Sequence, residues 1–139
     1  MRTLAAVTAA VMIASTATAS EHSYFSDSAA YACAGAAKSA GAYRSALASK
    51  NTGVVESALA QVAMFRLNMP ECEMGQAKAN VRAVESRGAT PELRYKAWVV
   101  RTLMENPGLF AAVPKSGYAE PDALFAALAG TLAEHYAAR

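Results

Sequence analysis

Two cysteines, Cys33 and Cys72, are the residues whose type and number point most directly to chemistry. An even pair of cysteines in a small domain forms a disulfide when the compartment is oxidising. This bond would close a loop of about 40 residues and contribute on the order of 4 kcal/mol in the chain-entropy model. A competing redox role would need a lowered thiol pKa at Cys72, but no C-x-x-C spacing accompanies it. The sequence therefore predicts a Cys33–Cys72 disulfide.

The first 19 residues have the organisation of a secretory signal peptide. Met1-Arg2 is a short positive region, Leu4–Ala14 is apolar, and Ala17-Thr18-Ala19 has the small-x-small cleavage pattern. No apolar run reaches the roughly 20 residues of a membrane helix. We therefore expect residues 1–19 to be removed and residues 20–139 to form a soluble exported domain without a stable membrane anchor. That domain would be secreted, and periplasmic if the host is Gram-negative.

Cleavage after Ala19 would create a possible metal site at the new amino terminus. Ser20 would carry the free amine, and Glu21 and His22 would follow it. The amine, two deprotonated amides and an imidazole nitrogen form a square-planar set suited to Cu(II) or Ni(II). The competing interpretation is a terminus with an incidental histidine. Metal handling is therefore an alternative function, with Ser20, Glu21 and His22 as its ligands.

Motifs of catalysis are absent from the chain. There is no G-x-S-x-G, no H-E-x-x-H, no phosphate-binding glycine loop and no metal-spaced cysteine set. His135 borders an apolar helix face, where a structural histidine is commoner than a catalytic one. Glu120 and Asp122 flank Pro121, where acids favour a helix start. The sequence predicts a protein that is not an enzyme and has no cofactor.

The charge balance excludes an electrostatic nucleic-acid binder. Lys and Arg number 13, one of them in the leader, against 11 acidic residues. No basic tract or aromatic-interleaved basic patch occurs. The alanine-rich composition, without strand-like alternation, favours helices throughout.

The clearest helix begins after Thr90 and ends at Asn106-Pro107-Gly108. Thr90 can cap free amides, Pro91 suits the first helical position, and Pro107 prevents continuation. A polar strip faces an apolar stripe on this helix. The stripe contains Leu93, Ala97, Val100, Leu103 and Met104, and the strip contains Arg94, Arg101 and Glu105.

Similar signals predict four further helices. The first runs from Ser26 or Asp27 to Ser49 or Lys50, the second follows Asn51-Thr52-Gly53 and ends before Pro70, the third runs from Pro70 to Gly88, and the last begins at Pro121. The predicted fold class is all-α, a small single-domain helical bundle of about five helices.

Tyr95 and Trp98 are the candidate partner surface. Trp98, the only tryptophan, lies at the edge of the polar strip, and Tyr95 widens the apolar stripe. A structural interpretation competes, in which the indole covers a neighbouring residue while its N–H reaches water.

Residues 88–132 carry a family resemblance. Its elements are Gly88-Ala89-Thr90, the leucine-bearing helix that follows, Asn106-Pro107-Gly108-Leu109, and the last helix with Leu124 and Leu128. This stretch resembles the C-terminal half of the periplasmic resistance-associated proteins that act as immunity proteins against type VI secretion toxins. The resemblance implies an exported helical protein that neutralises a protein toxin. The family's cysteines before the Gly-x-Thr element and near the C-terminus are absent here, so no functional residue is carried over.

The sequence therefore predicts an exported, non-enzymatic helical protein that binds another macromolecule, with an inhibitor or immunity-type role as the specific form. The alternative is a periplasmic copper- or nickel-binding protein that uses Ser20-Glu21-His22. A third class, a small hydrolase, lacks the carboxylate context that such an enzyme needs.

Overall fold

The computed structural model describes residues 23–27 and 30–139. Within these ranges there are five α-helices, a 3-10 helix η2 and no strand, so the predicted all-α bundle is confirmed. The elements are α1 (Cys33–Leu47), α2 (Thr52–Asn68), α3 (Gly75–Arg87), α4 (Pro91–Glu105), η2 (Pro107–Phe110) and α5 (Pro121–Ala137). The predicted signal peptide over residues 1–19 and the metal site at Ser20-Glu21-His22 lie outside the described residues.

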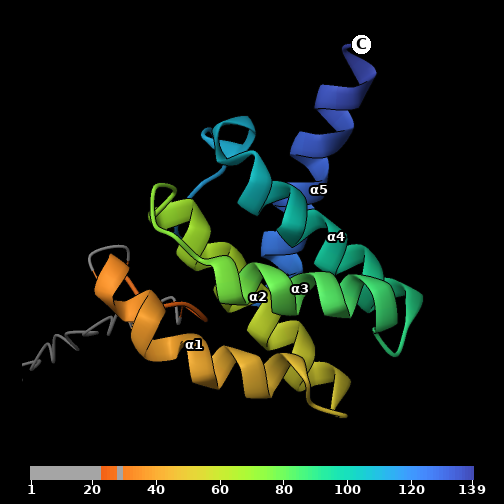
Figure 1. The fold of residues 1–139 in the computed structure, drawn as a ribbon. Coiled ribbons are helices and arrows are strands. Elements are labelled where there is room, and N and C mark those ends of the chain that lie inside the picture. The colour runs from red at the N-terminus through yellow and green to blue at the C-terminus, as the bar shows by residue number, and fades with distance from the viewer. Residues whose placement is uncertain (1–22, 28–29) are drawn as a thin grey trace, which may run out of the picture.

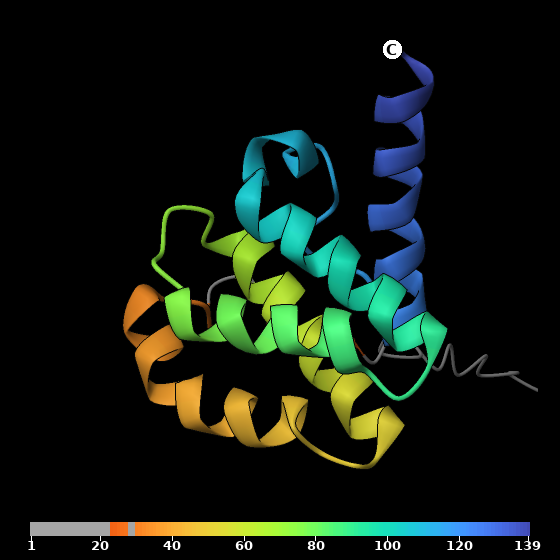
Figure 2. The same cartoon turned by 45° about the vertical axis from the view of Figure 1, so that its right-hand side comes forward.

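Helix α4 is the centre of the packing. It contacts α3 most extensively and α2 next, and α1 packs on α2 and α3 from the other side (Figure 1). Helix α5 contacts α2, α4 and η2, and its C-terminal end stands clear of the other helices in both views (Figure 2). None of the described helices combines the length and the apolar character that a membrane span requires.

The core is formed by aliphatic side chains from α2, α3, α4 and α5 together with Phe110 of η2. Val100, at the middle of the predicted stripe, is 0% exposed. The largest fully buried side chains are Phe110, Leu59, Met64, Leu103, Leu124, Leu128, Val62, Val81, Val99 and Val100. Fully burying one such side chain contributes roughly 1.5–3 kcal/mol, so this set supplies most of the drive to fold.

The helix starts of α2 and α4 follow their capping signals. The side-chain oxygen of Asn51 accepts from the amides of Gly53 (3.0 Å) and Val54 (3.3 Å). The hydroxyl of Thr90 accepts from the amide of Leu93 at 3.1 Å. Each cap satisfies amides that lack an intrahelical partner. Helix α4 starts where the sequence predicts it, whereas α2 begins at Thr52, inside the Asn51-Thr52-Gly53 segment that the sequence predicts to precede the helix.

Two other helix starts lie later in the chain than the sequence predicts. Helix α1 begins at Cys33 because the preceding segment is held elsewhere: Phe25 lies in the core with its ring 6.4 Å from Tyr118. Helix α3 begins at Gly75 because the chain first turns at Cys72, whose carbonyl accepts from the guanidinium of Arg66 at 2.8 Å. Long-range contacts override the local helix signals at both places.

The disulfide between Cys33 and Cys72 is confirmed, with a Cα–Cα distance of 5.5 Å and a sequence separation of 39. Cys33 is exposed at the start of α1, and Cys72 is buried before α3. Leu47 is the only buried residue within α1. The disulfide therefore fixes the end of α1 that has no buried side chain to anchor it.

The turn between α3 and α4 is tight and needs a glycine. A Cβ at Gly88 would lie 2.6 Å from the carbonyl oxygen of Val84, closer than real Cβ contacts allow. The guanidinium of Arg94 donates to the Gly88 carbonyl at 2.7 Å and closes the turn. This turn sets the position of the first residues of α4.

Candidate functional site

Two aromatic side chains lie on one face of α4. Tyr95 is 51% exposed, and its ring stacks on that of Trp98 with centroids 5.8 Å apart and an interplanar angle of 28°. Trp98 is half-buried and packs against the core. The spacing of three residues places both rings on the same side of the helix. We call this pair the α4 aromatic face.

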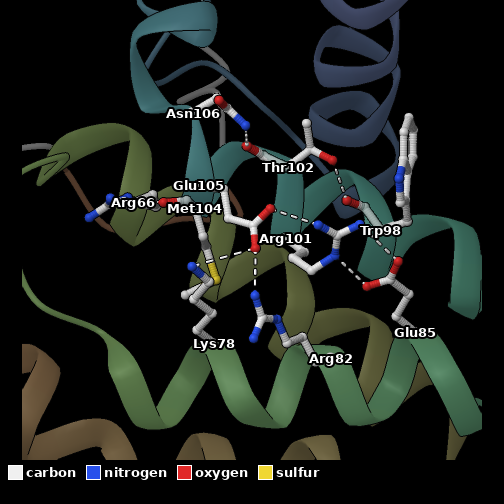
Figure 3. Close-up of polar contacts among 10 residues, drawn as sticks. All are labelled: Arg66, Lys78, Arg82, Glu85, Trp98, Arg101, Thr102, Met104, Glu105 and Asn106. Carbon is white, nitrogen blue, oxygen red and sulfur yellow. Dashed lines mark hydrogen bonds and ion pairs between the residues drawn. The ribbon is translucent and has the colours of Figure 1, made fainter.

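This arrangement agrees with the structural interpretation of Trp98, and its role at a partner surface stays a prediction. Its ring covers core residues, as the structural interpretation expects, and it also supports the exposed ring of Tyr95. In Figure 3 the indole projects away from the ion pairs of α4. Tyr95 is therefore the more exposed ring of the pair.

Next to the α4 aromatic face is a cluster of charges centred on Lys96. This lysine is 6% exposed, although it lies on α4 among buried residues. Its ammonium contacts Asp122 Oδ1 at 2.7 Å, Glu92 Oε1 at 2.8 Å and a carboxylate oxygen of Glu56. The ammonium also lies 5.2 Å from the centre of the Phe125 ring. The cluster joins α2, α4 and the first turn of α5.

The contacts of Lys96 shift its own pKa and that of Asp122. Burial by itself lowers the Lys96 pKa, but hydrogen bonds from its ammonium to Asp122, Glu56 and Glu92 outweigh burial and raise it. The hydrogen bond from Lys96 holds the Asp122 pKa below its ordinary value. Lys96 and Asp122 therefore both carry charge near neutral pH. The cluster contains three carboxylates and one ammonium, so acidic groups outnumber the basic one.

One oxygen each from Glu56, Glu92 and Asp122 lies within 4.8 Å of the others, a spacing that could hold a cation. The Lys96 ammonium contacts all three carboxylates and takes the position that a cation would need. The arrangement therefore works as an ion-paired clamp with acidic groups at the surface. The side chains of Glu92 and Asp122 are 72% and 70% exposed.

A second ion network lies between α3 and α4 (Figure 3). Arg101 donates from Nε to Glu85 Oε2 at 2.6 Å and from a terminal nitrogen to Glu105 Oε2 at 2.7 Å. Arg82 and Lys78 of α3 contact the same Glu105 carboxylate at 2.8 and 3.5 Å. The polar strip predicted on α4 is therefore a helix–helix contact rather than a solvated face.

The other side chains weighed as possible reactive groups are the two cysteines, His135, Glu120 and Asp122. The two cysteines lie with Glu71 in a group of possible metal ligands, but their sulfurs are bonded to each other. His135 lies near the end of α5 with its ring 5.5 Å from that of Tyr136. Asp122 pairs with Lys96, whereas Glu120 precedes the first turn of α5 and makes no side-chain capping hydrogen bond there. The structure brings none of these groups together in a catalytic arrangement of described residues.

Lys96 was not predicted as a site residue, although the sequence contains a pattern that indicates its ion pair. Lys96 follows Glu92 by four residues, the spacing of a helical ion pair. On the helical wheel it also lies between the buried Leu103 and Val100, which shows that a charge enters the apolar side of α4. Its partners Glu56 and Asp122 carry no local signal.

Comparison of the chain with family models, with curated proteins and with solved structures finds no match.

Proposed function

We propose that this is an exported, non-enzymatic helical protein that binds a protein partner through the α4 aromatic face, in the manner of an inhibitor or immunity protein. The proposal rests on the exposure of Tyr95. Its ring is 51% exposed, yet it is held in place by stacking on Trp98. A rigid exposed tyrosine supplies contact area at low entropic cost, which is why Tyr and Trp are enriched at binding hot spots.

The surroundings of this face indicate the chemistry of the partner. Glu92 lies one helical turn before Tyr95, and its carboxylate and that of Asp122 are largely exposed. A partner suited to this surface has an apolar contact ringed by Lys or Arg, since opposite charges at the rim speed association and fix orientation. Because residues 88–132 resemble type VI immunity proteins, we propose a secreted protein toxin as the specific partner.

The experiment is a capture assay with the mature protein immobilised and a periplasmic extract as the source of partner. Tyr95→Ala is the test variant, because removing an exposed ring leaves the core intact. Tyr136→Ala is the matched control, since Tyr136 is also exposed, at 54%, but lies near the end of α5. We expect one protein to be retained by the wild type and by Tyr136→Ala, and its affinity to fall at least about tenfold with Tyr95→Ala.

Two further measurements test the charges at the rim of this face and the inhibitory role. Binding should weaken with added salt and with Glu92→Gln, because the rim charges are exposed to solvent. If the retained protein is an enzyme or toxin, a stoichiometric amount of the wild type should inhibit it. Equal retention by the wild type and Tyr95→Ala would refute the assigned surface.

The copper or nickel alternative concerns residues outside the described part of the chain. It stays a prediction, and its test is given in the Discussion.

A further inference from the structure

A cleft of about 480 Å³ lies at the end of the bundle where the α1–α2 loop and the α3–α4 turn meet. Both connections lie at the same end of the molecule in Figure 1 and Figure 2. Its volume is within the range of roughly 300–1,000 Å³ that is typical of small-molecule sites. Neither Tyr95 nor Trp98 lines it. We call it the α1–α3 cleft.

The lining of the α1–α3 cleft has an apolar part formed by core side chains. Leu47 of α1, Val55 of α2, Val84 of α3 and Leu93 of α4 each line it while keeping only 5–6% exposure. A ligand that enters would cover the last exposed area of these side chains. An aliphatic or aromatic group suits this part of the cleft.

The charged lining is entirely cationic. Arg44 near the end of α1, Lys50 in the following loop and Arg87 at the end of α3 line the cleft, and no Asp or Glu is among its described lining residues. None of these three side chains makes a hydrogen bond or an ion pair within the described part of the chain. By contrast, the cations between other helices pair with carboxylates: Lys78, Arg82, Lys96 and Arg101.

A buried donor without an acceptor lies in the same cleft. Asn80 of α3 lines it, and the side-chain nitrogen of Asn80 is buried without a hydrogen-bond partner. Its side-chain oxygen accepts weakly from Gln76 Nε2, at 3.4 Å. A buried N–H without an acceptor is costly, and an acceptor on a ligand would satisfy it.

Helix-end electrostatics accounts for part of this arrangement. Arg44 and Arg87 lie in the last turns of their helices, where the dipole favours a cation by roughly 0.3–1 kcal/mol. That effect explains a cation at each helix end. It does not explain why three unpaired cations and an unsatisfied amide border the same apolar cleft without a carboxylate.

We propose that the α1–α3 cleft binds a small amphipathic anion, a monocarboxylate with an aliphatic body. The carboxylate would lie among Arg44, Lys50 and Arg87, with Asn80 as an additional donor. The aliphatic body would lie on Leu47, Val55, Val84 and Leu93. Guanidinium groups suit this task because they donate two parallel hydrogen bonds to one carboxylate. The site is separate from the α4 aromatic face, so it can be tested independently of the proposed partner.

The probe is decanoate, titrated into the mature protein by calorimetry below the concentration at which it forms micelles. We expect saturable binding of one decanoate per protein. Acetate has the charge without the chain and decanol has the chain without the charge, so each should bind at least about tenfold more weakly. Equal binding of decanol and decanoate would refute the role of the three cations.

The test variant is Arg44→Gln/Arg87→Gln, which removes two of the cations without touching the core. Its decanoate affinity should fall at least about tenfold, because hydrogen bonds to charged groups are lost. Lys38→Gln is the matched control: it removes a cation of α1 that does not line the cleft, and it should change the affinity less than about twofold. Equal affinities for the double variant and the wild type would overturn the proposal.

A second variant tests the cavity itself. Ala83 is half-buried on α3 and lines the cleft, so Ala83→Phe should fill it and abolish decanoate binding while circular dichroism stays unchanged. Vesicles containing phosphatidylglycerol test whether the three cations bind an anionic membrane surface instead of a free carboxylate. Co-sedimentation with these vesicles without any decanoate binding would overturn the proposal in favour of a membrane-surface contact.

Discussion

The ammonium of Lys96 lies 2.7 Å from the carboxylate of Asp122, and this ion pair joins the middle of α4 to the first turn of α5. Helix α5 makes fewer contacts with the bundle than α3 and α4 make with each other. The pair therefore adds an ionic contact to the apolar packing that holds the first half of α5 on the bundle. It also keeps two exposed carboxylates, those of Asp122 and Glu92, beside the α4 aromatic face.

Replacing Lys96 tests this clamp. Lys96→Met keeps the aliphatic stem but removes the charge that three carboxylates share, and we expect it to lower the free energy of unfolding by about 1–3 kcal/mol. Asp122→Asn should cost less than Lys96→Met, because the Asp122 carboxylate is exposed and solvent screens the ion pair. Urea denaturation measures both, with Lys38→Met as a control that should be near zero. Equal costs for Lys96→Met and Lys38→Met would contradict the clamp.

The pKa shifts predict a loss of stability in acid. The hydrogen bond from Lys96 lowers the Asp122 pKa below 3.8, and that from Arg82 lowers the Glu105 pKa below 4.5. A carboxyl whose pKa is lowered by folding stabilises the protein above its ordinary pKa, and this contribution is lost as the pH falls through the folded value. Melting temperatures should therefore fall from about pH 5 to about pH 3. The fall should be smaller for Lys96→Met, in which Asp122 has lost its partner.

The raised Lys96 pKa has the opposite consequence. Its contribution to stability is fully present below the ordinary lysine value of 10.5 and is lost only as the pH rises through the higher folded value. Lys96 should therefore add no pH dependence to the melting temperature between about pH 6 and pH 9. A wild-type slope in that range that disappears in Lys96→Met would contradict this sign.

Reduction of the Cys33–Cys72 disulfide should lower the melting temperature strongly. For a loop spanning 39 residues the chain-entropy model gives about 4 kcal/mol, equivalent to more than about 10 °C for a domain of this size. Calorimetry with and without reductant measures the shift, and Cys33→Ser/Cys72→Ser should match the reduced protein. Free thiols found by alkylation of the unreduced exported protein would show that the bond does not form in the cell.

An aspartate substituted on the buried side of α4 should destabilise the protein far more than one substituted on the side that faces α3. Val100→Asp places a charge at a position with 0% exposure and should prevent folding. Arg101→Asp should allow folding but cost about 1–2 kcal/mol, because it puts a third carboxylate between Glu85 and Glu105. The helical wheel alone predicts almost no cost at Arg101. Circular dichroism and urea denaturation distinguish these outcomes. Equal effects of the two substitutions would show that the assignment of a buried side and a polar side to α4 is wrong.

The amino terminus can be tested without structural information. Intact mass of the exported protein should show that it begins at Ser20, and retention of residues 1–19 on a soluble cytoplasmic product would contradict the signal peptide. If Ser20-Glu21-His22 is a site, one Cu(II) should bind with the absorption of a square-planar nitrogen set and release protons. His22→Ala, or one residue added before Ser20, should abolish this signal. Binding that survives either change would place the metal elsewhere.

Local chemistry in the sequence was enough to determine the fold class and several boundaries. Thr90 caps α4 as predicted, and the stripe through Val100 is buried, because capping and helical periodicity involve residues only a few positions apart. The disulfide could also be predicted, because two cysteines allow only one pairing. These features need no knowledge of how the helices pack.

The tertiary structure decided which charges meet. Lys96 pairs with Glu56 and Asp122, which lie 40 and 26 residues away, and Arg101 pairs with Glu85 across the α3–α4 contact. Arg44 and Arg87 come from separate helices and line the same cleft only because of how α1 and α3 pack. Helix faces and capped helix starts such as that of α4 are set by neighbours along the chain, whereas contacts between helices depend on crossing angles that side-chain packing selects. The candidate sites depend on such contacts, so the sequence by itself determined the elements and only the packed structure determined the sites.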